Sequence, residues 1–471
     1  MRAARARATG AGWVALTAVL TLVAAPPRPA RAGSVRGVVA AEGYALTYGG
    51  GEQTSATFGL DVRLDGSELT DRALATHIDG ELRIPVNGDL SDPSVPAYRL
   101  ERLSAGLDPT QGWVALAGRE WIVEVPTASV DGLTFGYRWE SFRLGGFGGL
   151  EPNPYDQTFD GQFMTGGGFF SLEGEQGGAG AGFVASFYDG NADRESLTGQ
   201  GRWSPLREFD AFGSLRLDLG VAGQATRLGS LAVGGDWRAT PTFRLGGSFT
   251  TYRYLLRPES LDAAEIENVA NPQRESIEGR ARYELSHDLY TRARLSYRLR
   301  QAVPSYEVRI LPEGAPLDGT AGEVYIDDQG RSYTLAATTT DESSFGGGLA
   351  LGGRRLASLP LRWEVAYTGV TGFGRNDHEG ALSAGFDVGD GASLDLGAGV
   401  DLRNRDETGS DVGGFARAEL FWLVDRDWFA LASYEATIAD GDLDHALLAK
   451  VGYRIRPPAG SATAARAGEA R

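Results

Sequence analysis

Residues 277–299 read IEGRARYELSHDLYTRARLSYRL, and this stretch decides the fold class. Every second residue is apolar or small, whereas the residues between them are mostly charged. Alternation with a period of two predicts two β-strands, each with one apolar and one charged face. The polar break at 286–288 separates the two strands and predicts a hairpin turn.

The two predicted strands are long enough to cross a bilayer at a tilt, which takes about 9 to 11 residues. Strands of soluble sheets are usually shorter, about 5 or 6 residues. The charged face is crowded with arginine, which a wide water-filled barrel accommodates and a small closed core does not. The chain of 471 residues is therefore expected to be all-β, a transmembrane antiparallel up-and-down β-barrel of roughly 18 to 24 strands.

The composition narrows the functional classes. The 67 Gly residues are about twice the usual share of roughly 7%. The chain has no Cys, so disulfides and a lipidated N-terminal cysteine are excluded. Arginine supplies every basic residue except Lys450 and is spread over the whole chain, which we interpret as genome composition. The net charge of −17 argues against a nucleic-acid partner.

The chain begins with the pattern of a secretory signal peptide, expected over residues 1–32. Arg2, Arg5 and Arg7 form a positive region, and the apolar run at 12–25 is too short for a typical membrane helix. The sequence Ala-Arg-Ala at 30–32 then offers a cleavage site. We expect a barrel over residues 33–456, a polar tail over 457–471, and a location in the bacterial outer membrane.

The strand pattern is clearest after residue 130 and least clear before it. Strands are expected at 37–48, 56–64 and 73–84. The apolar runs 113–117 and 121–125, divided by Gly-Arg-Glu, are interpreted either as barrel strands or as a turn across the periplasmic rim. Residues 301–342 are expected to be a folded loop or an additional strand pair.

The lengths of the connections predict the topology. Short connections are expected at 239–242, 286–288, 389–391 and 425–427, and longer polar ones at 189–196, 255–275, 301–342, 371–377 and 404–411. Short and long connections that alternate are typical of an outer-membrane barrel with tight periplasmic turns and larger external loops. Aromatic residues flank two short turns, Trp237 with Phe243 and Trp422 with Trp428, at positions expected for an interfacial girdle.

Two segments resemble known families. Residues 112–149 contain GWVALAGREWIVEVPTASVDGLTFGYRW followed by LGGFGG, which is similar to the strand-GR-spacer-DG-strand passage of bacterial porins of the alginate-export kind. The matching residues are Gly118, Arg119, Asp131 and Gly132, and the match covers under a tenth of the chain. The resemblance implies that barrel strands follow the Asp-Gly turn.

The last predicted strand, KVGYRI at 450–455, resembles the C-terminal assembly signal of outer-membrane barrels. It lacks the usual final Phe or Trp, because Pro457 occupies that place. The resemblance implies the barrel-assembly machinery and outer-membrane lipid as partners.

No catalytic or metal motif is present in the sequence. The four histidines are far apart, and no pair has metal-ligand spacing on one element. Acidic clusters such as Asp440, Asp442 and Asp444 are interpreted as solvated loop tips, although clustered carboxylates also suit Ca²⁺. We expect no enzyme activity, no cofactor and no metal. An embedded hydrolase that joins Ser and His across strands would leave no motif and stays a second alternative.

The arginine-rich face is the candidate functional site. The expected pore-lining residues are Arg280, Arg282, Arg292, Arg294, Arg298, Arg300, Glu278 and Glu284. Six arginines against two glutamates leave a local surplus of four positive charges, and rings of such charge favour anions in channels. The structural alternative is a charge ladder in which the glutamates pair with nearby arginines. The expected function is passive passage of small solutes with a bias toward anions, and the first alternative is a non-transporting surface barrel with a structural or adhesive role.

Overall fold

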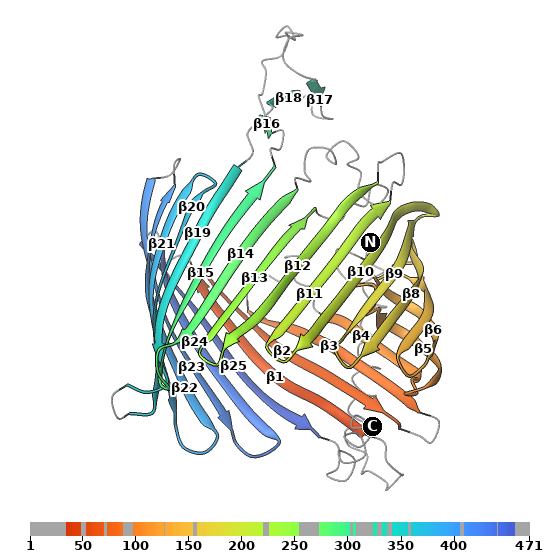
Figure 1. Cartoon of the computed structure of the whole chain (residues 1–471), viewed down its shortest axis with the longest axis horizontal. Helices are drawn as coiled ribbons and strands as arrows, with labels where there is room; N and C mark the ends of the chain where they lie inside the picture. Colours follow the sequence, from red (N-terminus) through yellow and green to blue (C-terminus); the bar gives the residue numbers. More distant parts are fainter. Residues whose placement is uncertain are drawn as a thin grey trace.

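The computed structural model describes residues 34–48, 53–69, 73–87, 98–126, 128–153, 158–219, 226–253, 273–301, 305–307, 324–326, 332–336, 342–356, 359–405, 409–439 and 441–456. Twenty-two strands within these ranges form one antiparallel sheet (Figure 1). Pairing of β1 with β25, from Gly37↔Ile455 to Thr47↔His445, closes the sheet on itself. The predicted fold class is confirmed, and the strand number falls inside the predicted range.

The first fifteen strands follow one another around the wall. Their bounds are β1 Ser34–Tyr48, β2 Gln53–Ser67, β3 Leu74–Asn87, β4 Tyr98–Leu107, β5 Gly112–Trp121, β6 Ser129–Arg138, β7 Phe142–Leu150, β8 Phe163–Gly174, β9 Gly177–Tyr188, β10 Asn191–Leu206, β11 Phe209–Leu219, β12 Arg227–Thr240, β13 Phe243–Tyr252, β14 Arg274–Glu284 and β15 Leu289–Arg300.

The wall then continues from β15 directly to β19. The remaining wall strands are β19 Glu342–Gly353, β20 Leu361–Gly372, β21 Arg375–Asp387, β22 Ala392–Arg405, β23 Gly409–Leu423, β24 Trp428–Ala439 and β25 Asp442–Ile455. Between β15 and β19, the short strands β16 Ser305–Glu307, β17 Val324–Ile326 and β18 Ser332–Ala336 form a separate sheet, which lies beyond one rim of the barrel (Figure 1). Within the expected segment 301–342, the described residues between Gln301 and Glu342 thus form three short strands outside the wall, and the others lie outside the described ranges.

The strands have two faces because side chains alternate across a pleated sheet. On β14 and β15 the apolar set includes Ile277, Tyr283, Leu295 and Tyr297, which are 44–57% exposed. In a closed barrel such a band faces lipid, and the lack of a free sheet edge lets every backbone group pair inside the wall. Among the described residues, no helix is both long enough and apolar enough to cross a membrane.

Aromatic side chains gather where short turns join the strands. Trp237, Trp422 and Trp428 are each about half exposed beside such turns. Trp428 packs on Tyr453 with ring centroids 5.0 Å apart. Indole rings at strand ends match the headgroup level of a bilayer, where one end of the ring is wet and the other apolar.

The short turns are where the sequence predicted them. β12 and β13 are joined by Pro241 and Thr242, and β23 and β24 by residues 424–427. In the second turn, the Asp425 carboxylate accepts hydrogen bonds from the backbone N–H groups of Asp427 and Trp428, at 2.7 and 2.8 Å. These donors lower the pKa of the Asp425 carboxyl. The carboxylate therefore stabilises the turn at pH values above its unfolded-state pKa, and this contribution is lost as the pH falls through the lowered value.

Three predicted connections are wrong. The expected loop at 189–196 is a turn of Asp189 and Gly190, and β10 begins at Asn191. The expected loop at 371–377 is a turn of Phe373 and Gly374. Asp189 and Phe373 both have positive φ, 47° and 56°, followed by a positive-φ glycine, so each tight turn is built by two left-handed residues. The third, 404–411, reduces to residues 406–408 between β22 and β23.

The lipid face on β22 can be tested by two single charges. Leu396 lies in the apolar set, whereas Asp395 points to Arg362, with 3.5 Å between Oδ1 and Nη2. Leu396→Arg places a guanidinium against lipid, which costs about 2 to 4 kcal/mol at the bilayer midplane. Asp395→Arg removes only an exposed ion pair, worth about 1 kcal/mol or less. Refolding yield into vesicles should fall much more for Leu396→Arg, and equal losses would mean that the face assignment is wrong.

Candidate functional site

The eight predicted site residues all lie on β14 and β15, on the face opposite the apolar band. The register places Arg280 opposite Arg294 and Arg282 opposite Arg292. On the other side of β14, Arg282 also lies opposite Arg244 of β13. Like charges directly opposite one another in an antiparallel pair are destabilising. The wall must therefore offset the repulsion in these rows.

Carboxylates offset most of the repulsion between these arginines. Five of the six hairpin arginines form ion pairs, which are Arg280–Asp236, Arg282–Glu284, Arg292–Glu364, Arg294–Glu278 and Arg300–Glu342. Within the described part of the chain, Arg298 is the hairpin arginine for which no ion pair is found. The predicted surplus of four charges is too large, because Asp236, Glu364 and Glu342 belong to strands that the hairpin sequence does not contain.

Ion pairs that span an intervening strand identify the charged face as the concave face of the barrel wall. Arg280 of β14 donates to both carboxylate oxygens of Asp236 on β12, at 2.8 and 2.7 Å, across β13. Arg362 of β20 reaches Asp395 of β22 across β21. Side chains on the inside of a curved wall converge, so second-neighbour strands come within reach of each other. The arginine-rich face is therefore the inner face of the barrel.

A glycine occupies the middle strand beneath each of these two bridges. Gly246 is in register with Asp236 on one side and with Arg280 on the other. A Cβ on Gly246 would lie 2.4 Å from Oδ1 of Asp236 and 2.5 Å from Nε of Arg280. Gly385 holds the same position between Arg362 and Asp395, with 2.4 Å from its Cβ position to Oδ1 of Asp395. Because glycine has no side chain, each ion pair can pass over the middle strand at this position.

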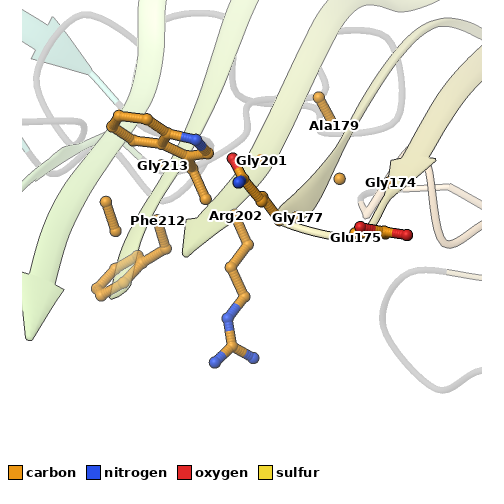
Figure 2. A pocket seen from close by; sticks show the side chains of 12 residues that line it. Gly174, Glu175, Gly177, Ala179, Gly201, Arg202, Phe212 and Gly213 are labelled. Carbon is orange, nitrogen blue, oxygen red and sulfur yellow. The ribbon is translucent and has the colours of Figure 1, made fainter. Parts of the chain in front are cut away.

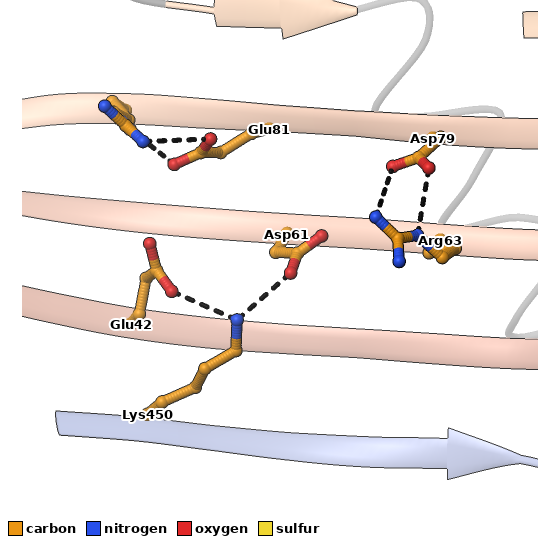
Figure 3. Close-up of polar contacts among 7 residues, drawn as sticks. Glu42, Asp61, Arg63, Asp79, Glu81 and Lys450 are labelled. Atoms are coloured by element: carbon orange, nitrogen blue, oxygen red, sulfur yellow. Dashed lines mark hydrogen bonds and ion pairs between the residues drawn. The ribbon is translucent and has the colours of Figure 1, made fainter. Parts of the chain in front are cut away.

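Ion pairs to a neighbouring strand and to the strand beyond it also occur at the seam, where β25 pairs with β1. Lys450 of β25, the only lysine of the chain, donates to Glu42 of β1 at 3.1 Å and to Asp61 of β2 at 3.0 Å (Figure 3). Next to it, Arg63 pairs with Asp79 of β3, with 2.9 Å between Nε and Oδ2. The inner wall at the seam is thus also a network of paired charges, with more carboxylates than cations among these five residues.

The arginine wall contains a depression of about 490 Å³. Five guanidinium groups and two carboxylates line it, those of Arg244, Arg280, Arg282, Arg292, Arg294, Asp236 and Glu278. Arg282 also lies over the Tyr290 ring, 4.0 Å from its centroid. The depression is therefore cationic on balance, and apolar side chains such as Leu245 and Leu349 also line it.

A second depression, of about 850 Å³, lies at the turn between β8 and β9 (Figure 2). It is shallow, and backbone of Gly174, Gly177, Gly201 and Gly213 forms much of its surface. Arg202, its cation, is engaged by Asp210 on the neighbouring strand. The depression presents neither a nucleophile beside a base nor converging ligands, so its size does not indicate a site.

One segment of the described chain leaves the wall and packs on its inner face. Residues 122–128 connect β5 and β6, and the side chain of Val125, which is 0% exposed, belongs to a buried cluster with Phe147, Phe169 and Val184 from β7, β8 and β9. Gln200 of β10 donates a hydrogen bond to the carbonyl oxygen of Val123 at 2.7 Å. The segment therefore narrows the lumen on that side.

This inward segment was missed by the sequence analysis. The run 121–125 was interpreted as a strand or a rim turn, and Trp113–Ala117 as a separate strand, but β5 is continuous from Gly112 to Trp121 and the chain then turns inward. The apolar residues Ile122 and Val125 contact the inner wall, in a cluster that also includes Val130 of β6. The available signal was Pro126, because a proline directly after the apolar run argues against its continuing as a central strand.

The histidines have local partners. His77 bonds Asp65 at 2.8 Å, and His378 and His445 bond Tyr367 and Tyr434 at 2.7 and 2.8 Å. These three histidines lie in strands, and His287 lies in the β14–β15 turn. In the described ranges, no group of three or more His, Asp or Glu side chains is arranged to hold a metal ion. Asp440 lies outside the described residues.

No family model matches the sequence, and no curated protein matches it. Solved structures with a similar fold include a BenF-like porin from Pseudomonas fluorescens Pf-5, at 8% identity and a TM-score of 0.46, covering 90% of this chain and 98% of that one. Acinetobacter baumannii OccAB4 gives 9% identity and a TM-score of 0.42, covering 91% and 99%. A bacterial polysaccharide outer membrane secretin gives 11% identity and a TM-score of 0.34, covering 67% and 97%. At these values the likeness carries no argument, and the fold rests on the strand pairing of this chain.

The glycine beneath the Asp236–Arg280 bridge can be tested by adding a methyl group. Gly246→Ala should break the bridge, whereas Gly279→Ala, with nothing within 4 Å of the added Cβ, should not. Alanine in place of strand glycine alone is worth about 0.5 to 1 kcal/mol, and the lost exposed ion pair about 0.2 to 1 kcal/mol. Unfolding in vesicles, followed by tryptophan fluorescence, should find Gly246→Ala less stable than Gly279→Ala. The difference should shrink when both are made in an Asp236→Ala background, where only the contact with the flexible Arg280 side chain remains, and an undiminished difference there would contradict the bridge.

Proposed function

We propose that this protein is a bacterial outer-membrane channel for the passive passage of small solutes. The observation that supports the proposal is the two-faced wall, apolar toward lipid and charged toward the inside, in a closed barrel of 22 strands. With strands about 4.8 Å apart and tilted by about 40°, such a wall encloses a diameter of about 40 Å between backbones. Side chains alone do not fill that width, so the lumen holds water.

Two sequence features support the proposed location in the bacterial outer membrane. An N-terminal export signal over residues 1–32 delivers the chain across the inner membrane. The last strand, β25, carries the alternating pattern KVGYRI that resembles the barrel-assembly signal. Outer-membrane lipid and the barrel-assembly machinery are therefore the partners that we propose, together with small solutes.

The charge pattern supports a weak bias toward anions. Ion pairs neutralise most hairpin arginines. Among the described hairpin residues Arg298 has no ion pair, and Arg244 adds a further cation to the lining of the 490 Å³ depression. Acidic residues dominate at the seam between β25 and β2. Since exposed charges more than about 8 Å from a passing ion are largely screened at physiological salt, the bias concerns ions that pass close to β13–β15.

Planar bilayer recordings test both parts of this proposal. Stepwise conductance supports a channel, and a folded but silent barrel would favour the alternative of a non-transporting surface protein. Reversal potentials in a salt gradient then measure selectivity. Replacing Arg292, Arg294 and Arg298 with Ser removes three cations, of which Arg298 has no ion pair among the described residues, and takes the arginine partners from Glu364 and Glu278, so the anion-over-cation preference should fall or reverse.

A matched control removes the same number of arginines from other walls. Arg63, Arg83 and Arg202 are each ion-paired on strands away from the hairpin, and their replacement by Ser should change selectivity less. If the hairpin variant keeps the selectivity of the unmodified channel, these arginines serve only to hold the wall together, and the anion bias is wrong.

A further inference from the structure

The pairing between β4 and β5 stops early. It extends from Leu103↔Arg119 to Leu107↔Ala115, five positions, the smallest number between neighbouring wall strands of the described chain. Residues 98–102 of β4 therefore have no strand partner on that side among the described residues, although β5 runs on to Trp121 in register with β6. Unpaired backbone groups in a membrane wall are costly. Something must replace the missing ladder.

The Arg119 side chain replaces part of it. Its Nη1 donates to the carbonyl oxygen of Leu100 at 2.8 Å, just beyond the last paired position of β4. Its Nε and Nη2 donate to both oxygens of Asp131 on β6, each at 2.6 Å. The two side chains are only 6% and 10% exposed. One guanidinium thus joins β4, β5 and β6 at the point where the ladder ends.

Two glycines let neighbouring backbones approach there, Gly118 toward β4 and Gly132 toward β7. Gly118 lies opposite Gly132, and the pair directly adjoins Arg119 and Asp131. Gly118 has φ of 126°, and a Cβ on it would lie 2.1 Å from the carbonyl oxygen of Leu103. A Cβ on Gly132 would lie 2.3 Å from the carbonyl oxygen of Gly148. The four residues singled out in the sequence as a Gly-Arg and Asp-Gly motif therefore form one structural unit, which we call the staple.

The chain leaves the wall after Trp121, shortly after the staple. The inner face has a complementary site for this segment, around Gly182 and Arg143, which we call the seat. The position of a Cβ on Gly182 is 2.2 Å from Cγ2 of Val125, so only glycine leaves room for that side chain. Glu124 forms an ion pair with Arg143 of β7 at 3.1 Å. A shift of β5 by one residue would turn Val125 and Glu124 away from these partners, because successive side chains alternate in direction.

We propose that the staple is a positioning device, in which Arg119 and Asp131 fix where residues 122–128 leave the wall and thereby hold that segment in its inner seat. Its consequence for lumen width rests on the proposed channel function. The seating itself does not, because it concerns only contacts within the barrel. The two consequences can therefore be measured separately.

Cross-linking measures the seating directly, in a chain without native cysteine. The position of a Cβ on Gly182 lies 2.2 Å from Cγ2 of Val125, so Val125→Cys/Gly182→Cys brings the two thiols within reach of a disulfide, which needs about 3.5 to 4.5 Å between Cβ atoms. This pair should oxidise rapidly in the otherwise unmodified barrel. Adding Arg119→Met and Asp131→Leu removes the staple without leaving a buried unpaired charge, which alone would cost about 3 to 5 kcal/mol. The rate of disulfide formation should then fall several-fold.

Two further variants separate positioning from general stability. Arg63→Met/Asp79→Leu removes another arginine–aspartate pair of the wall and should leave the cross-linking rate unchanged. Arg119→Lys keeps a charge beside Asp131, but a single ammonium does not reproduce the fork that also reaches Leu100. It should give an intermediate rate, and it keeps the test valid if the double variant does not fold.

Single-channel conductance of the variants without added cysteines gives the second readout. Loss of the staple should raise the conductance or add open-channel noise, as should Gly182→Val, which blocks the seat while leaving the staple intact. A silent barrel whose cross-linking rate still depends on the staple would support the positioning role and reject the channel. Cross-linking that is equally fast with and without the staple, in a folded barrel, would overturn the inference.

Discussion

The constraint on which this structure depends is that a strand in lipid must pair every backbone group while presenting opposite chemistry on its two faces. Closure of β1 on β25 leaves the sheet without a free edge, and Arg119 bonds the Leu100 carbonyl where the β4–β5 pairing stops early. The period-two alternation gives the two faces their opposite chemistry. The unfavourable energy is the repulsion between like charges on the inner face, where charged side chains are crowded on a concave surface. The ion pairs that span a glycine, such as Asp236–Arg280 over Gly246, offset that repulsion.

The sequence predicted well what depends on neighbours along the chain. The hairpin at 277–299, the short turns beginning at Pro241 and Asp425, and the pairing of Glu278 with Arg294 and of Glu284 with Arg282 all require only alternation and one turn. The bridges over an intervening strand were beyond reach, because they require the register of a third strand. Asp236 and Arg280 are 44 residues apart, and nothing local relates them.

Two errors have a common physical cause. Asn191 and Arg375 begin strands in segments so polar that they read as loops. Inside a wide lumen, however, a polar face is compatible with a long strand. Conversely, the run 121–125 is apolar enough to be interpreted as a barrel strand, yet Ile122 and Val125 pack on the inner wall against Phe147 and Phe169. In each case polarity indicated the wrong environment, because the inner face of this barrel is polar in most places and apolar where residues 122 and 125 pack.

The most direct test of the two-faced wall is single-cysteine labelling along β14, since the chain has no native cysteine to interfere. A membrane-impermeant thiol reagent would be applied to barrels in bilayers that carry one cysteine at each position from 277 to 283. The structure predicts a period of two, with cysteines at 278, 280 and 282 labelled and those at 277, 279, 281 and 283 protected by lipid. Uniform labelling, or the opposite alternation, would contradict a water-filled lumen lined by the arginine hairpin.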